Sequence, residues 1–576
     1  MGGVKMYLKQ IPNKKSGRVF LSIVEPYRHK ESGNTRTKTV KALGYLDELE
    51  KEMDDPITYY KEVAKEMTEE KKARRHTVKL ECSMDDTISE SQCDFKNIGY
   101  LALSRIYHEL GLHRFMSNRQ RSLETEYQLS AVLKMLVYQR ILDPGSKKYT
   151  YEHREQYCET YDFSLTDVYR SLTRFAGMKD TLLKHLHKYV TKNYSRDTTN
   201  VFYDVTNYYF EIDEPDELRK KGVSKEHQPS PIVQLGLLLD ERGLPITYKL
   251  FSGNTNDSQT LLPVLSEVRR EYGIDRMVVV ADRGLNTGDN IAYNLLKGDG
   301  YVFSQTVRGA NQELKRYVLR QSDYRVSEDG FKIKSRVYPR TISVTNAQGK
   351  KVDVSIDEKQ VVFYSDKYAR RAKAEREPAL LKAKMIVDNP SMYNKSTAYG
   401  AARYIKHLVF DKDTGEVISV GKCPQFNLEK LHEEEQWDGY YAIVTSELHF
   451  SDEQVIDTYR GLWQIEDAFK VTKSELATRP VYVSRRDRIE AHFLTCFISL
   501  LILRILELKT KRQFSAARII ESLNRANGVY VEDDLYVFSH FDEVLSQVGQ
   551  VTGFDFDLKY RSRSDIRSLV AASKKV

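Results

Sequence analysis

The spacing of apolar residues changes several times along the chain, and each change predicts a different kind of structure. Residues 5–45 read as short strands with turns, and residues 57–75 look helical and charged. Residues 97–195 repeat apolar side chains at the 3.6-residue period of helices, for example at Leu129, Val132, Leu133 and Leu136. We therefore expect a β/α segment over residues 1–75 and a helical region over residues 76–198.

After residue 200 the pattern becomes that of a mixed sheet. Strands are expected at residues 201–206, 232–240, 246–251, 277–282 and 301–307, and amphipathic helices at residues 259–272 and 287–296. The order of these elements, β-β-β-α-β-α-β, is that of an RNase H-like fold. We expect the first part of such a core over residues 199–307.

Residues 308–440 do not continue this order, because they mix short strands with a charged helix and turns. We expect a β-rich inserted domain over residues 308–445. A helical pattern returns at residue 452 and predicts the second part of the core over residues 446–510, followed by a C-terminal region over residues 511–576. The predicted fold class is multidomain α+β, with an RNase H-like core interrupted by the insertion.

Composition narrows the class of protein only slightly. The 576 residues are 40% hydrophobic and 30% charged, and Lys+Arg exceed Asp+Glu by eight. Residues 1–45 hold ten lysines and arginines against two glutamates, an excess of positive charge equal to that of the whole chain. This basic segment could contact DNA phosphates or could simply form a solvated surface. The helical region over residues 76–198 is likewise a candidate DNA-binding module or a structural bundle.

Cysteine and apolar content argue against zinc ribbons and membrane spans. None of the five cysteines is paired at CxxC spacing, and their scattered placement fits a reducing compartment. The most apolar stretch, residues 493–506, is too short to cross a bilayer and predicts a buried helix. We expect a cytoplasmic protein without a membrane partner.

Two aspartates in the predicted strands are candidates for metal chemistry. Asp204 sits among the apolar residues Val201, Phe202 and Val205, and Asp282 follows the apolar strand 277–281. A carboxylate in such surroundings needs a partner or a cation. Two carboxylates on adjacent strands are typical of a magnesium site, because such hard cations take oxygen ligands. For a single aspartate, a strand-end residue that caps a turn would be the better interpretation.

A third carboxylate lies on the helix predicted to follow residue 452. Tyr459, Trp463, Glu466, Lys470 and Lys473 fall on neighbouring faces of that helix. Glu466 could complete the metal site while the lysines bind DNA phosphates. The alternative is a surface helix with a Glu466–Lys470 pair that contributes a few tenths of a kcal/mol.

The segments around Asp204, Asp282 and Glu466 together resemble the DDE transposases of the IS four superfamily, and the IS sixteen-thirty-four group in particular. Tyr459, Glu466 and Lys473 match the Tyr, Glu and Lys of the family's helix motif, whereas Leu462 stands where the family has Arg, and Arg460 lies two residues earlier. Further resemblance lies in residues 253–257, 282–284 and 488–492 and in the N-terminal segment, so that it spans nearly the whole chain.

The resemblance implies a mechanism and a set of partners. Asp204, Asp282 and Glu466 would hold two Mg²⁺ ions, with Mn²⁺ able to substitute, for cleavage at transposon ends and strand transfer into target DNA. Relatives pass through hairpin ends and synapse two ends, which implies a homodimer on DNA in a bacterial or archaeal cytoplasm, associated with the nucleoid. The family alternatives are an RNase H-like nuclease or resolvase that does not join strands, and a catalytically silent DNA-binding protein.

The resemblance also suggests DNA-contacting and supporting residues. Relatives stack a flipped base on an aromatic of the insertion, and Tyr441 is the matching position, with Trp437 and Tyr440 close by. Tyr459, Arg460, Lys470 and Lys473 are the further candidates for DNA contact. Thr206 and Asn207, beside Asp204, and His492 are candidates for support of the metal site, although a satisfied core histidine is the commoner role of a residue like His492.

Overall fold

The computed structural model describes residues 6–12, 17–28, 35–73, 85, 87, 95–123, 125–212, 214–222, 230–327, 330–389, 400–407, 409–410, 417–419, 424–531 and 534–575. It forms two compact units, one of residues 1–108, 152–161 and 518–576 and the other of residues 109–151 and 162–517. The helical region expected over residues 76–198 is therefore divided between the two units. Residues 1–5, 13–16 and 29–34 of the basic leading segment lie outside the described residues.

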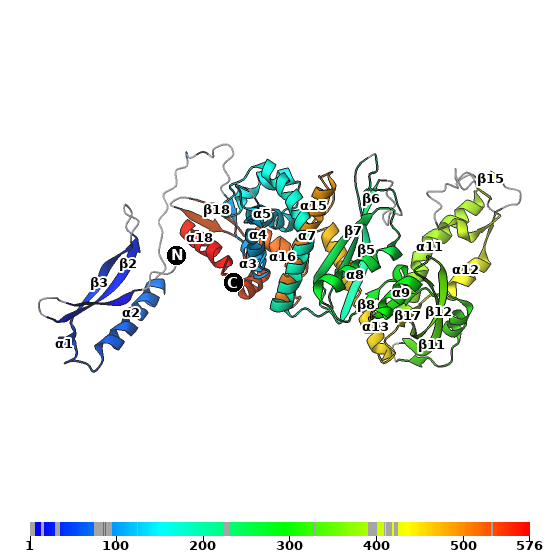
Figure 1. Ribbon diagram of the computed structural model, residues 1–576, viewed down its shortest axis with the longest axis horizontal. Helices are drawn as coiled ribbons and strands as arrows, with labels where there is room; N and C mark the ends of the chain where they lie inside the picture. The colour runs from blue at the N-terminus through cyan, green and yellow to red at the C-terminus, as the bar shows by residue number, and fades with distance from the viewer. Residues whose placement is uncertain are drawn as a thin grey trace. The chain divides into compact units, whose positions relative to one another are not determined.

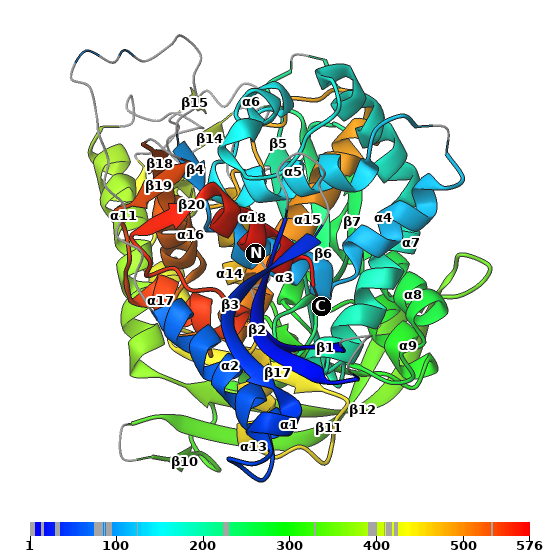
Figure 2. The same ribbon diagram turned by 90° about the vertical axis from the view of Figure 1, so that its left-hand side faces the viewer.

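The first unit begins with a small antiparallel sheet and a helix (Figure 2). Strands β1 (Tyr7–Pro12), β2 (Val19–Arg28) and β3 (Thr35–Tyr45) pair in sequence order, and α1 (Leu46–Leu49) leads to α2 (Pro56–Ala73). Met6, Ile23 and Ala64 form an apolar cluster between the strands and α2. This cluster explains why a charged helix stays on the sheet, since its few apolar side chains face the strands.

The rest of the first unit joins segments far apart in the sequence. Strand β4 (Phe95–Asn97) pairs with β18 (Asn527–Tyr530), which continues through β19 (Leu535–Phe538) to β20 (Tyr560–Ser562). The Asn97 side-chain amide donates to the Leu523 carbonyl at 2.9 Å and to Asn527 Oδ1 at 3.0 Å. The remaining elements are α3 (Tyr100–Glu109), η1 (Arg154–Gln156), α16 (Ala516–Arg525), α17 (Glu543–Thr552) and α18 (Arg563–Ser573).

The second unit is built on a nine-stranded sheet in the order β10-β11-β12-β17-β9-β8-β5-β6-β7 (Figure 1). Its central strands are β5 (Asn200–Tyr209), β6 (Ile232–Leu239), β7 (Pro245–Ser252), β8 (Val278–Ala281) and β9 (Gly300–Gln305). β5, β6 and β7 pair antiparallel, whereas β5, β8 and β9 run parallel. All five expected strands are present, and they occupy neighbouring positions in one sheet.

The two faces of these strands meet different helices. Val201, Tyr203 and Val205 belong to an apolar cluster with α8 (Leu261–Tyr272) and α9 (Gly288–Leu296). Because successive strand residues point to opposite faces, Phe202 and Asp204 lie on the other face. That face meets α13 (Asp452–Arg460) and α14 (Trp463–Lys473). The two helices join at Gly461, which packs so closely on Phe202 that an added Cβ would lie 2.5 Å from its ring. We call this side the α13 face.

The segment predicted as an inserted domain, residues 308–445, extends the central sheet. Strand β17 (Tyr440–Thr445) pairs antiparallel with β9, and β12 (Lys351–Tyr364), β11 (Lys332–Thr345) and β10 (Arg325–Val326) extend the sheet beyond it. Hydropathy identifies such strands but not their partners, because pairing joins residues more than a hundred positions apart, as in Val444 opposite Phe303.

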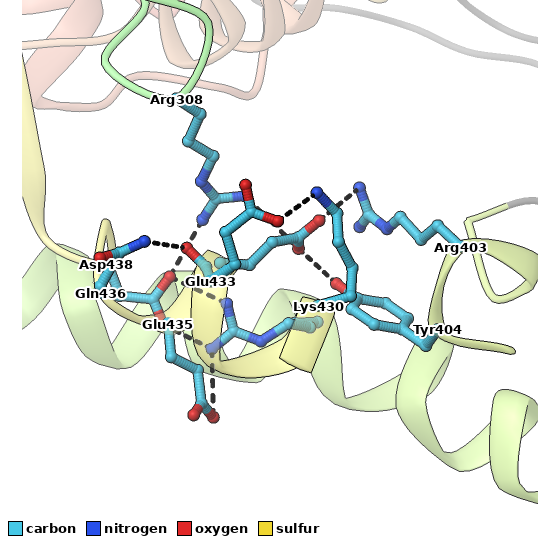
Figure 3. Close-up of polar contacts among 10 residues, drawn as sticks. Arg308, Arg403, Tyr404, Lys430, Glu433, Glu435, Gln436 and Asp438 are labelled. Carbon is cyan, nitrogen blue, oxygen red and sulfur yellow. Dashed lines mark hydrogen bonds and ion pairs between the residues drawn. The ribbon is translucent and has the colours of Figure 1, made fainter. Parts of the chain in front are cut away.

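Helices accompany the strands in this segment. It contains α10 (Gln312–Leu319), α11 (Asp366–Asp388), η5 (Ala402–Tyr404) and α12 (Leu428–Glu435), besides the short pairs β13 (Ile405–Lys406) with β16 (Gln425–Phe426) and β14 (Val409–Phe410) with β15 (Val417–Ser419). Figure 3 shows the charged side chains that converge on α12 and the turn after it. Asp438, which leads into β17, accepts hydrogen bonds from Arg308 at 3.0 Å and from the buried Arg376 at 2.9 Å.

The remaining helices of the second unit are α4 (Leu112–Gln120), α5 (Leu129–Leu142), α6 (Lys147–Glu152), α7 (Leu165–Tyr194) and α15 (Arg486–Lys509). Helix α15 packs against α5 and α7. By length and composition α15 could cross a membrane, but 94% of its most apolar window is buried inside the protein. This agrees with the buried helix expected over residues 493–506.

Candidate active site

The register of two parallel strands places Asp204 and Asp282 at the same level of the sheet. Phe202 on β5 lies opposite Val280 on β8, and each aspartate follows two residues later. Asp282 comes directly after β8 and keeps an extended backbone, with φ −78° and ψ 168°. Neighbouring strands lie about 4.8 Å apart, so the two carboxylates project side by side from the α13 face. Asp204 is half-buried and Asp282 is exposed.

Two hydroxyl groups hold one oxygen of Asp282. Ser304 Oγ donates to Asp282 Oδ1 at 2.7 Å, and Tyr459 Oη on α13 donates to the same oxygen at 3.4 Å. Burial and the Asp282 charge raise the pKa of Tyr459, so its hydroxyl stays protonated and remains a donor. The sequence candidates did not include Ser304, because its place beside Asp282 depends on the pairing of β8 with β9.

Glu466 lies on α14, the helix that follows α13 after Gly461 and Leu462. Tyr459 contacts Asp282, and the Lys473 ammonium lies 5.7 Å from the centre of the Tyr208 ring on β5. Glu466 and Lys473 are seven residues apart on α14 and therefore share a face. The Glu466 side chain is exposed. Helix α14 packs on β5 and carries the third carboxylate at an exposed position.

The donor set suits a hard divalent cation, because carboxylate oxygens are the ligands that Mg²⁺ and Mn²⁺ accept. Within the described ranges, however, no three His, Cys, Asp or Glu side chains form a group that could hold a metal ion. Asp204 and Asp282 fit such an ion as a pair, and Glu466 is not grouped with them in this arrangement.

The aromatic candidates of residues 437–441 separate into one exposed and one buried side chain. Tyr441 is 44% exposed, and its ring stacks on Phe363 with centroids 5.6 Å apart and planes 13° apart. Trp437 is 8% exposed and packs with Val362 and Ala442. The expected DNA contact by Trp437 is therefore corrected, since the core of this segment covers its ring.

The basic candidates of α13 and α14 lie in different surroundings. Arg460 pairs with Asp457 at 3.2 Å and lines a pocket of about 380 Å³ with Arg325 and Phe331. Lys470 is exposed and borders a second pocket, of about 340 Å³, with Trp463. Leu462, at the family's Arg position, is buried.

The two candidates for support of Asp204, Thr206 and Asn207, lie on opposite faces of β5. Thr206 shares the α13 face with Asp204 and is buried. Asn207 lies on the opposite face of β5, so it does not support Asp204 from the same side. It pairs across the strands with Gln234, whose side chain donates to Asp257 at 3.4 Å.

His492 is a core histidine. Its Nε2 donates to the Thr478 carbonyl at 2.8 Å, and its Nδ1 accepts from Lys147 Nζ at 3.1 Å. Burial, with the charges of Lys147 and Arg140, holds the pKa of His492 well below its usual value. Both ring nitrogens are thus engaged in the interior, and support of the metal site by His492 is corrected to a structural role.

Family models match most of the chain in two blocks. The transposase DDE domain matches residues 212–502, just over half of the chain. The chain belongs to the DDE transposase family. The N-terminal domain of IS1634 family transposases matches residues 8–79 of this chain, which confirms the resemblance noted from the sequence. Asp282 and Glu466 lie within the DDE match, and Asp204 lies just before it.

Solved structures of other transposases also align with part of this family member. One is the Mos1 transposase paired-end complex with left transposon end, at 16% identity and a TM-score of 0.12 over 29% of this chain and 57% of that chain. Another is the Mos1 mariner paired end complex with Mn, at 17% identity and a TM-score of 0.11 over 29% and 55%. The alignments thus span little more than half of the Mos1 chains. No curated protein matches this chain.

Proposed function

We propose that this protein is a cut-and-paste transposase that cleaves DNA at transposon ends and joins the freed ends to target DNA. The observation that carries the proposal is the level placement of Asp204 and Asp282 on adjacent parallel strands, with α14 and its Glu466 over the same face. The central strand order β7-β6-β5-β8-β9, with the first three strands antiparallel and the last two parallel to β5, supports an RNase H-like core.

Asp204, Asp282 and Glu466 would hold two Mg²⁺ ions, or Mn²⁺ in their place. Bound there, the ions supply the Lewis acidity that hydrolysis and transesterification of a phosphodiester need. In the first step a water oxygen bonds to phosphorus and the bond to the 3′ oxygen breaks, which frees a 3′ hydroxyl. In the second step that hydroxyl attacks a target phosphodiester and displaces its 3′ oxygen.

The chain's own residues orient these reactants. Ser304 and Tyr459 occupy Asp282 Oδ1, so Oδ2 is the oxygen left to face a ligand. Lys470 and Lys473 contribute positive charge on the helix that carries Glu466, where DNA phosphates would lie. Tyr441 offers an exposed ring for a flipped base during a hairpin step.

Transposon-end DNA and target DNA are the proposed partners, and a homodimer would hold two ends together. The match of residues 8–79 to a transposase N-terminal domain supports contact with transposon ends. Such a protein would work at the nucleoid of a bacterial or archaeal cytoplasm.

The test uses purified protein, Mg²⁺ or Mn²⁺, a plasmid target and DNA that carries the sequences flanking the gene. Asp204→Asn, Asp282→Asn and Glu466→Gln are compared with Glu453→Gln, an exposed carboxylate change on α13. We expect cleavage and joining in the wild type and the control, and loss of both by at least a hundredfold in the three site variants. Cleavage without joining would identify a nuclease, and binding without cleavage a silent DNA-binding protein.

A further inference from the structure

An open groove lies between α4, the C-terminal half of α7 and the end of α8. Its volume is about 660 Å³, and Phe115, Arg119, Lys184, Lys188, Lys192 and Tyr272 are among its lining residues. The groove is not part of the candidate active site, because Asp204 and Asp282 project from the face of the sheet opposite to α8.

The rim of the groove carries more positive charge than its neighbours neutralise. Lys184, Lys188 and Lys192 recur every four residues on α7 and therefore form one stripe about 12 Å long. Lys188 and Lys192 are exposed, and in the described part of the chain neither forms an ion pair. Lys184 pairs with Glu271 at 3.5 Å, and among the described lining residues Glu271 is the one carboxylate.

The second wall adds another cation and the floor is aromatic. The Arg119 guanidinium on α4 lies 5.4 Å from the centre of the Phe115 ring. His185 stacks on Tyr189 at 4.4 Å, and His187 stacks on Tyr272 at 5.0 Å. Burial lowers the pKa of His185 and lowers that of His187 to about 4, so both rings are neutral at pH 7.

We propose that this groove binds the phosphodiester backbone of DNA through Lys188, Lys192 and Arg119, as an anchoring surface separate from the catalytic face. A row of cations along one helix complements a row of phosphates, and exposed cations without ion-pair partners release DNA counterions most effectively. The aromatic floor adds flat apolar surface below the charged rim. This inference rests on the proposed function, because it assigns a contact to the DNA that the active site would cleave.

The test measures DNA affinity of the full chain as a function of salt. Lys188→Glu/Lys192→Glu is compared with Lys297→Glu/Lys350→Glu, which makes the same change of net charge at two exposed lysines outside the groove. Each protein is titrated with a duplex and a single strand of equal length, with and without transposon-end sequence. Thermal unfolding of both variants checks that the exposed substitutions leave the fold intact.

We expect the groove variant to lose at least tenfold in affinity at about 0.1 M salt, equally for end and unrelated sequences. The slope of log affinity against log salt should fall by about 1.8, which corresponds to two lost phosphate contacts. Loss confined to duplex or to single strand would assign the groove to that form of the backbone. Equal affinity and slope in the two double variants would overturn the groove proposal while leaving wild-type cleavage intact. Wild-type protein that binds no DNA would instead refute the proposed function.

Discussion

Replacement of Ser304 by Ala tests whether the hydroxyl groups around Asp282 prepare it for catalysis. Ser304 Oγ donates to Asp282 Oδ1 at 2.7 Å, and hydrogen bonds to charged groups contribute about 1.5–3 kcal/mol. If that energy orients the carboxylate, its loss should reduce cation affinity and cleavage by about 10- to 100-fold. Thermal stability should change little, because Asp282 is exposed and water can replace the lost donor.

The assay follows end cleavage against Mg²⁺ concentration, together with direct titration of Mn²⁺ binding without DNA. Ser304→Thr, which keeps a hydroxyl, should recover most of the cation affinity. Ser446→Ala is the matched control, because its hydroxyl accepts from the Tyr301 backbone at 3.0 Å and belongs to the neighbouring strand connection. Unchanged cation affinity in Ser304→Ala, or an equal loss in Ser446→Ala, would refute the orienting role.

Two further substitutions test the aromatic surface and the buried lysine. Tyr441→Ala should impair hairpin formation more than first-strand nicking, because the exposed ring on Phe363 is the proposed platform for the flipped base. Equal loss of both steps on a denaturing gel would contradict this. Burial lowers the pKa of Lys147 to about 7, so folding should become less favourable as pH falls from about 10.5 to 7, by up to about 5 kcal/mol. Lys147→Met should therefore raise the melting temperature at pH 7 and make the melting temperature less dependent on pH between 7 and about 10.5. If the melting temperatures of wild type and variant instead change in parallel with pH, Lys147 is not a neutral buried lysine.

The two aspartates could be predicted from sequence because their signal is local. Asp204 interrupts a run of strand residues, and Asp282 ends another, so each stands out within a few positions of its own segment. That the two strands are neighbours followed from the resemblance of the element order to an RNase H-like fold, because β6, β7 and α8 lie between β5 and β8 in the chain. The family's helix motif added Tyr459, and the structure places its hydroxyl on Asp282.

Other contacts could not be predicted because they depend on pairing and burial. Ser304 has no distinguishing feature in its own segment, and it reaches Asp282 only through the register of β8 with β9. Trp437 and Tyr441 are equally attractive aromatics in the sequence, and only the packing of α10 and β12 decides that the first is buried. His492 lies in the second turn of the apolar helix α15, and its two hydrogen-bond partners come from separate segments.

Continuity of the sheet gives the inserted segment a direct part in the architecture of the site. Ser304 lies opposite Ile443 on β17, and opposed residues of an antiparallel pair project from the same face, so Tyr441 shares the α13 face with Ser304. Tyr441 lies two positions before Ile443, a distance of about 7 Å along the strand. The aromatic platform is therefore held relative to Asp282 by backbone hydrogen bonds between β9 and β17, and a shift of the insertion would require those bonds to break. For this reason Asp438→Asn, which weakens the Arg376 contact before β17, should leave hairpin formation on a denaturing gel close to that of the wild type, because the β9–β17 hydrogen bonds still hold Tyr441.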